Sequence, residues 1–372
     1  MNSHQLWLVT RYSFTEIWRN RTFGIAFLIL IPLIIAYQLS FQSDIFNIPV
    51  EYTLVLSSFI PTQNAYLFNL LQVFPLATMG FWVHKQKKNN TLEALFVHPQ
   101  GNGTYSAGST IGIIGAFMLM GILSLAIAGL INLFASPTGF RPLIYLFYLI
   151  TLFLPTIIFI VGMTSFLSAR CFKNSAVTTL FMLVYLGVDI LYLSKLYHGL
   201  LDPLGILLPY TFSDFTGMAD LAGFLLHRMT FFLVGIGLAT LAASGFPRIP
   251  NMVNGRQLAG ITGFLVLLAG ILSGYTGYNR HKQMEYRQTL YKSVYNKYAQ
   301  NNKINVTTHE IRFAYREKQA QMESRITLKN STTGPCSEII LYLNPSLEVT
   351  SIQEHDKPIP FTKDAQVIII PY

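Results

Sequence analysis

The sequence predicts a polytopic α-helical membrane protein, with a six-helix core and a seventh span, followed by a small C-terminal domain rich in β-strands. Three observations predict this fold. Of the 372 residues, 52% are hydrophobic and only 12% are charged, which is about half the charged fraction of an average soluble domain. Seven stretches are apolar and long enough to cross a bilayer as helices. The last 94 residues are polar instead. A soluble globular chain and a disordered chain are both excluded.

The seven apolar stretches are separated by connectors that contain most of the charged residues. They comprise residues 23–40, 59–83, 109–134, 143–169, 176–193, 229–246 and 258–278. Before the first span, aromatic and basic residues recur at spacings of three and four, which predicts an amphipathic helix in the headgroup layer. These residues are Trp7, Arg11, Phe14 and Trp18. The alternative is a short extension of the first span's own helix.

The basic residues predict the orientation of the spans. If the N-terminus is cytoplasmic, ten Lys and Arg residues lie in inner connectors, and only Arg141, Lys195 and Arg228 lie in outer ones. Such an asymmetry is typical of the cytoplasmic side of membrane proteins. It accounts for the net charge of +9 without nucleic-acid binding. Seven spans then leave the C-terminus outside, the reverse of a receptor coupled to heterotrimeric G proteins.

The C-terminal segment, residues 279–372, is predicted to be a separate water-facing domain. Residues 280–299 have the pattern of a polar helix that continues the last span outward, with an apolar side formed by Leu290, Tyr291, Val294, Tyr295 and Tyr298. Apolar residues then alternate at period two around 311–315, 326–328, 339–343 and 367–370. This alternation predicts a small β-sandwich-like module.

Motifs for catalysis are missing from the sequence. There is no G-x-x-x-x-G-K-[ST] phosphate loop, no H-E-x-x-H zinc motif and no G-x-S-x-G serine elbow. The two cysteines, Cys171 and Cys336, exclude a disulfide framework. We therefore expect no catalytic centre, metal or cofactor in this chain, and any energy coupling has to come from a partner or an ion gradient.

Polar residues inside the spans are candidate functional positions. Four amides on the second span, Gln63, Asn64, Asn69 and Gln72, either line a conduit or form hydrogen bonds between helices. Asp189 is the ionisable residue that lies well inside a predicted span. Its carboxylate either serves transport or is satisfied at the interface by Tyr192, Lys195 or water.

The connector at residues 84–108 is the longest predicted inner loop. Thr91 can cap a short helix that places Leu92, Leu95 and Phe96 on one side, and Pro99 ends it. An exposed apolar helix face needs a surface that covers it. That surface is either a partner protein, or the chain's own bundle and the lipid headgroups.

The stretch Lys88-Asn-Asn-Thr-Leu-Glu-Ala-Leu-Phe-Val-His-Pro99 resembles the signature of ABC-2 type permeases, the membrane subunits of ATP-binding-cassette exporters. The resemblance implies a coupling helix that docks on a separate ATPase, with Thr91, Leu92, Glu93, Leu95, Phe96 and Pro99 at the contact. Residues 1–22 resemble the family's elbow helix, residues 23–246 its six-span permease domain, and residues 247–278 a cytoplasmic linker with a seventh span. Residues 279–372 are similar to the β-rich N-terminal region of zinc aminopeptidases that follows the spans in a bacterial subgroup.

The function that this resemblance implies is export driven by ATP across the bacterial inner membrane. Expected partners are a cytoplasmic ATPase that holds ATP and Mg²⁺, a second copy or a similar permease, membrane lipids and an extracytoplasmic protein at the C-terminal domain. The sequence leaves two alternatives. One is a non-transporting sensor or scaffold whose outer domain binds a partner, and the other is an ion-coupled carrier that uses Asp189.

Overall fold

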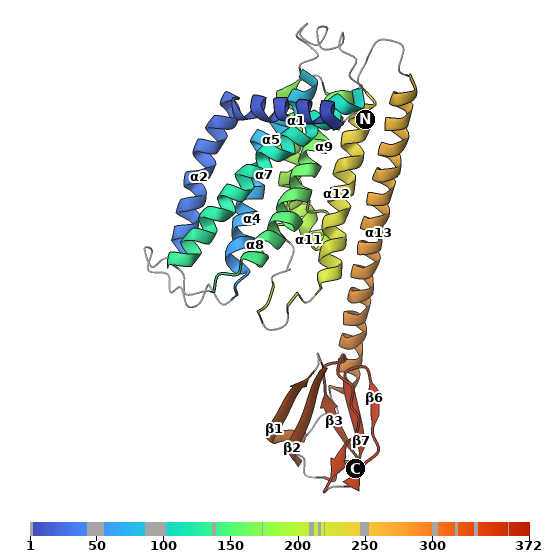
Figure 1. The fold of residues 1–372 in the computed structure, drawn as a ribbon. Coiled ribbons are helices and arrows are strands. Elements are labelled where there is room, and N and C mark those ends of the chain that lie inside the picture. Colours follow the sequence, from blue (N-terminus) through green and yellow to red (C-terminus); the bar gives the residue numbers. More distant parts are fainter. Residues whose placement is uncertain are drawn as a thin grey trace. The chain divides into compact units, whose positions relative to one another are not determined.

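The computed structural model describes residues 3–42, 56–85, 102–135, 139–172, 174–207, 212–214, 217–218, 220–245, 253–299, 304–316, 319–330, 334–355 and 357–372. The chain divides into two compact units, Met1–Tyr278 and Asn279–Tyr372. The first unit is a bundle of helices. The second contains the end of a long helix and all the named strands (Figure 1).

Six helical segments of the described chain are long and apolar enough to cross a membrane, so the protein is membrane-embedded. They are formed by α2 (Arg21–Gln42), α7 (Asn102–Ala135), α8 with η3 and α9 (Pro142–Tyr148, Leu149–Phe153, Leu154–Arg170), α10 with η4 (Ser175–Val188, Asp189–Leu193), α12 (Leu221–Ala243) and α13 (Val253–Tyr298). Both η3 and η4 are π-helical turns. A short helix, α11 (Ser194–Tyr197), follows η4.

The predicted stretch 59–83 forms two consecutive helices, α4 (Phe59–Leu71) and α5 (Val73–Lys85), each of 13 residues. Gln72 joins them as a single turn residue, and its backbone N–H donates to Phe68 O at 2.9 Å. Pro75 carries no N–H, so Leu71 O lacks its helical donor at the point where α4 ends. Neither helix alone is long enough to span a membrane.

A separate helix, α1 (Ser3–Trp18), precedes the bundle and lies crosswise to α2 and α7 (Figure 1). Two glycines of α7 let the helices approach closely. A Cβ at Gly108 would lie 2.7 Å from Val9 Cγ1, and one at Gly112 would lie 2.8 Å from Ser13 Cβ. The backbone of α7 therefore packs directly against α1.

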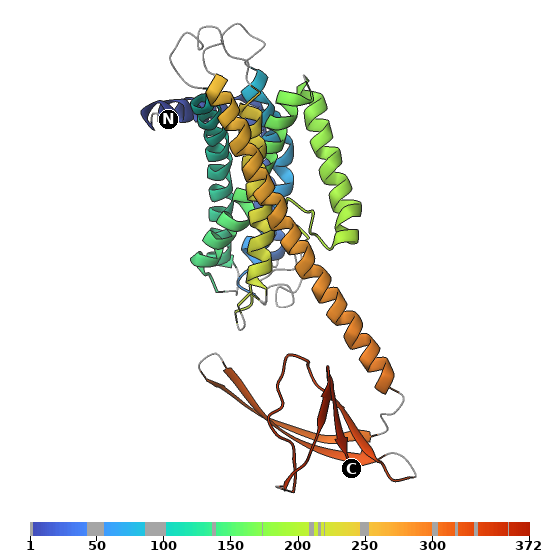
Figure 2. The same cartoon turned by 90° about the vertical axis from the view of Figure 1, so that its right-hand side faces the viewer.

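Small residues also bring α9, α12 and α13 together in the bundle. A Cβ at Gly162 of α9 would lie 2.1 Å from the backbone oxygen of Gly235 on α12, so the two backbones touch where they cross. Along the other side of α12, a Cβ at Gly270 of α13 would lie 2.8 Å from Val234 Cγ2. Figure 2 shows α12 and α13 running beside each other. The core around α9 is closely packed, with Phe153, Ile157 and Ile160 fully buried.

The second unit combines the end of α13 with seven strands. The predicted helix over 280–299 is confirmed, since α13 continues unbroken to Tyr298. Val294 of this helix packs against Ile340 and Val367 in a small buried cluster. The strands are β1 (Ile304–Arg316), β2 (Gln319–Asn330), β3 (Glu338–Tyr342), β4 (Gln353–Glu354), β5 (Lys357–Pro358), β6 (Thr362–Asp364) and β7 (Val367–Pro371).

The strands form three antiparallel sheets and not the expected sandwich. β3, β7 and β6 form one sheet, β4 and β5 a short hairpin, and β1 and β2 a long hairpin. On one face of the long hairpin, Glu310 opposes Arg325 and Arg312 opposes Glu323. The other face carries Ile311 and Phe313, which are 56% and 62% exposed. Because the described side chains of this hairpin are mostly exposed on both faces, it does not pack against a second sheet.

Candidate functional site

The predicted ATPase-coupling residues lie outside the described residues. This applies to Thr91, Leu92, Glu93, Leu95, Phe96 and Pro99. The helices on both sides of this segment are described, because α5 ends at Lys85 and α7 begins at Asn102. The predicted connector 84–108 is therefore too long at its C-terminal end, because residues 102–108 belong to α7.

The predicted interfacial residues lie on α1, which packs against the first turns of α7. Trp7 and Trp18 are 62% and 42% exposed, as an apolar surface facing lipid headgroups would be. Phe14 stacks on Trp18 with ring centroids 6.0 Å apart, and Trp18 also meets Phe23 of α2. Arg11 is exposed. The aromatic contacts stabilise the sharp change of direction between α1 and α2.

Two of the four predicted amides hydrogen-bond to neighbouring helices at one side of the bundle. Gln63 Oε1 accepts from the Tyr37 hydroxyl at 2.9 Å. Asn64 accepts from Gln38 Nε2 at 3.2 Å and donates to Ser124 Oγ at 3.0 Å, so that it links α2, α4 and α7. These bonds satisfy polar groups that are fully buried at Gln38, Asn64 and Ser124.

The other two amides belong to a buried cluster centred on Arg228 of α12. The guanidinium group donates through Nε to Thr151 O at 2.9 Å, through NH1 to Pro203 O at 3.2 Å, and through NH2 to Leu152 O at 3.2 Å and Thr156 Oγ1 at 2.8 Å. The residue is only 2% exposed. All four acceptors are neutral oxygens, three of them from the backbone.

Asn69 completes the same cluster from α4. Its Nδ2 donates to Leu204 O at 2.8 Å and also contacts Leu152 O and Thr156 Oγ1, both at 3.3 Å. Gln72 Nε2 donates to Asn69 Oδ1 at 3.0 Å. The cluster thus joins α4, η3, α9, α12 and the loop after α11.

Local sequence explains why backbone oxygens face Arg228. Pro155 has no N–H, so the α-helical donor for Thr151 O is missing. The chain also widens into the π-helical turn η3 over Leu149–Phe153, and such turns disturb the regular pairing of carbonyls. Arg228 supplies the donors that the helix does not.

The Pro203 oxygen that Arg228 binds belongs to the loop after α11, which is inserted into the bundle. Asp202 and Leu204 of this loop are fully buried. The Asp202 carboxylate accepts from Leu204 N at 2.8 Å and from Leu207 N at 2.9 Å, which forms a tight turn. Gly205 has φ +72°, and a Cβ there would lie 2.9 Å from Leu152 Cδ2 and 3.0 Å from Arg228 NH1. Glycine therefore allows the loop to reach the guanidinium group.

The expectation that Arg228 lies in an outer connector is wrong. Helix α12 begins at Leu221, eight residues before the predicted span, with Asp220 as its cap: the Asp220 side chain accepts from Gly223 N. His227 is also buried, and its Nε2 contacts Gly199 O at 3.1 Å. A hydropathy scale counts these two side chains as polar and takes no account of the oxygens that surround them. The predicted span therefore begins only after them. Asp220 followed by Leu-Ala-Gly-Phe-Leu-Leu is a cap signal that could have located the true start.

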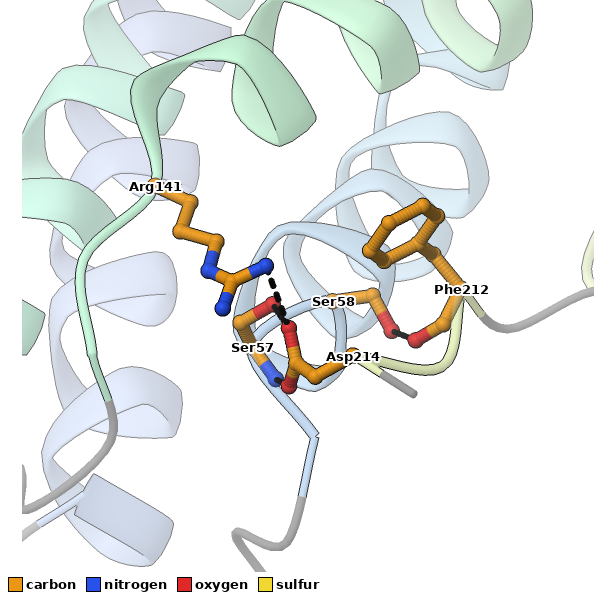
Figure 3. Close-up of polar contacts among 5 residues, drawn as sticks. All are labelled: Ser57, Ser58, Arg141, Phe212 and Asp214. Atoms are coloured by element: carbon orange, nitrogen blue, oxygen red, sulfur yellow. Dashed lines mark hydrogen bonds and ion pairs between the residues drawn. The ribbon is translucent and has the colours of Figure 1, made fainter. Parts of the chain in front are cut away.

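A second set of polar contacts joins three connectors, those before α4, before α8 and before α12 (Figure 3). Asp214 accepts from Ser57 Oγ at 2.6 Å and from Ser57 N at 2.9 Å, and it pairs with Arg141 at 3.1 Å. Ser58 Oγ donates to Phe212 O at 2.6 Å. These hydrogen bonds from Ser57, followed by the charge of Arg141, lower the pKa of Asp214.

Asp189 lies at the junction of α10 and η4 and is fully buried. Neither carboxylate oxygen has a hydrogen-bond partner among the residues that the structure describes. Tyr192 and Lys195, the predicted interface partners of this carboxylate, are exposed.

Together these contacts hold the inserted loop against one end of the helical bundle. No family model matches this chain, and no curated protein matches its sequence.

Proposed function

We propose that this protein is the membrane permease subunit of an ATP-driven exporter of the ABC-2 type, in the bacterial inner membrane. Two copies, or one copy and a similar permease, form the pathway between their bundles. Each pairs with a separate cytoplasmic ATPase. The N-terminus is cytoplasmic, α4 and α5 together provide a further crossing, and residues 279–372 are extracytoplasmic.

The observation that carries this proposal is the direct packing of α1 on the start of α7. The connector with the coupling signature ends where α7 begins, and Gly108 and Gly112 leave no space between α7 and α1. Ser13 Oγ and Ser109 Oγ also meet at 3.3 Å. A force applied to the connector therefore moves α7 and α1 together, as a small contact that couples rigid bodies requires.

The basic residues agree with this orientation once Arg228 is assigned to the bundle. Only Arg141 and Lys195 then remain in the proposed outer connectors, against ten Lys and Arg residues in the inner ones. Removing Arg228 from the count strengthens the positive-inside asymmetry.

Copurification tests the proposal. A tagged chain extracted in mild detergent should bring down an ATPase, and Leu95→Asp should abolish that association by placing a charge on the docking face. Leu290→Asp, on an exposed part of α13, is the matched control and should retain the ATPase. Recovery of no ATPase with the native chain, or an equal yield with Leu95→Asp, would refute the proposal.

A further inference from the structure

Asp189 is a carboxylic acid in the apolar interior of the helical unit, where α10 changes into the π-helical turn η4. It is 0% exposed, and its two oxygens have no hydrogen-bond partner among the described residues. An ionised carboxylate without donors is very costly away from water, whereas the neutral acid is tolerated. Ionisable residues within membrane spans and π-helical turns are both typical of functional positions.

The charges around Asp189 do not compensate a negative carboxylate. Its electrostatic neighbours are Asp202, which is also acidic, and the Tyr185 phenol one turn earlier on α10. Of the helices that pack against α10, α5 carries its ionisable residues, His84 and Lys85, at its last two positions, and α9 ends at Arg170, which precedes α10 in the chain. Lys195 on α11 is exposed.

Asp202 has the hydrogen-bond donors that Asp189 lacks among the described residues. It accepts two backbone N–H groups, and Arg228 attracts it electrostatically. Two neighbouring carboxylates do not both ionise readily. Of the two, Asp189 has no described donor to offset the cost of ionisation.

We infer that Asp189 is a proton-binding site of the helical unit, protonated while the loop of Asp202 is inserted and ionised only when that loop withdraws or water enters. The bound proton and the seated loop then stabilise each other. Release of the proton places a second negative charge beside Asp202 and favours withdrawal of the loop from the Arg228 cluster. This site does not depend on the proposed export function.

Infrared difference spectroscopy of the full chain in lipid bilayers tests the site directly. Between neutral and alkaline pH, the wild type should lose the C=O stretch of a protonated carboxyl group, and Asp189→Asn should lack this signal. Asp214→Asn, at an outer carboxylate that is already ionised, is the matched control and should retain it. If no such signal depends on Asp189, the proposal is overturned, whatever the state of export activity.

Two further measurements examine the coupling to the loop. Dicyclohexylcarbodiimide, an apolar reagent that modifies protonated carboxyl groups, should label Asp189 at neutral pH, with labelling falling as the pH rises. Asp202→Asn removes the like charge, so the infrared signal should be lost about one pH unit lower, a tenfold weaker hold on the proton. An unchanged midpoint in Asp202→Asn would overturn the link between the proton and the loop.

Discussion

Arg228 Nε donates to the carbonyl oxygen of Thr151 at 2.9 Å, at the position in the helix where Pro155 withholds the usual donor. A charged side chain from one helix thus replaces a missing backbone hydrogen bond in another. The same guanidinium group also binds Pro203 O, so the break in the helix and the inserted loop share one donor. The loop is therefore held by a feature of the helix and not by its own packing alone.

Replacing Arg228 should destabilise the bundle. Arg228→Met leaves Thr151 O without a donor, whereas Leu152 O keeps Asn69 and Pro203 O keeps Thr156. A buried unsatisfied group costs about 1–3 kcal/mol, and we expect a loss of that size, measured as a lower midpoint of thermal unfolding in detergent. Arg287→Met, at an exposed position of α13, is the control, and equal midpoints for the two variants would contradict this role.

A methyl group at the crossing of α9 and α12 should separate the two helices. In Gly162→Ala the new Cβ would meet the backbone oxygen of Gly235, which no change of rotamer can relieve. We expect a loss of about 1–3 kcal/mol in the free energy of unfolding. Gly187→Ala in α10 has open space around its Cβ and should be neutral or slightly stabilising. The close crossing would be unimportant if both variants unfolded alike.

The contribution of the Asp214 contact to stability should depend on pH. Hydrogen bonds from Ser57, together with Arg141, lower its folded pKa, so its stabilising effect is complete above the unfolded value of about 3.9. That effect is lost as the pH falls through the lowered folded pKa. The wild type should therefore exceed Asp214→Asn in thermal midpoint at neutral pH, with the difference vanishing in strong acid.

The ion pair itself should contribute little to that difference. Arg141 is 55% exposed in its side chain, and exposed pairs are worth about 0–1 kcal/mol. Arg141→Gln should therefore keep most of the pH dependence that Asp214→Asn removes. A flat pH dependence of the wild type relative to Asp214→Asn would show that the Ser57 contact does not act on stability.

Disrupting the small core of the second unit should unfold that unit and leave the helical unit folded. Val294→Asp buries a carboxylate against Ile340 and Val367, in a cluster of three buried residues. Limited proteolysis of the full chain should then cleave residues 304–372 rapidly and spare the helical unit. Leu290→Asp, on the same predicted stripe but 41% exposed, should resist cleavage like the wild type. Equal sensitivity of the two variants would exclude a core at Val294.

The helices were largely predictable from the sequence because apolar length alone requires them. The predicted stretches 109–134 and 176–193 lie within α7 and α10–η4. Hydropathy gave the wrong span boundary where a side chain of one helix donates hydrogen bonds to backbone oxygens of another. His227 and Arg228 look like the end of a span until the oxygens of Thr151 and Pro203 are placed beside them.

The buried cluster could be predicted only in part. Asn69 and Gln72 are recognisable as polar residues within a span, but the Asn69 partners Thr156 and Leu204 come from distant parts of the chain. Asp202 sits in a Leu-Asp-Pro-Leu-Gly sequence that has the composition of a surface loop. Its insertion depends on three-dimensional contacts that no local pattern encodes.

The long hairpin of the second unit has an order of charges that selects its alignment. In a two-stranded hairpin with little burial on either face, hydrophobic burial only weakly determines which residues of the two strands pair. Sliding one strand by two positions would set Glu310 against Glu323, or Arg312 against Arg325, according to direction. Both misalignments bring like charges together, which is unfavourable. Repulsion between like charges in the shifted registers thus determines the pairing of the strands, which a buried core determines in other sheets.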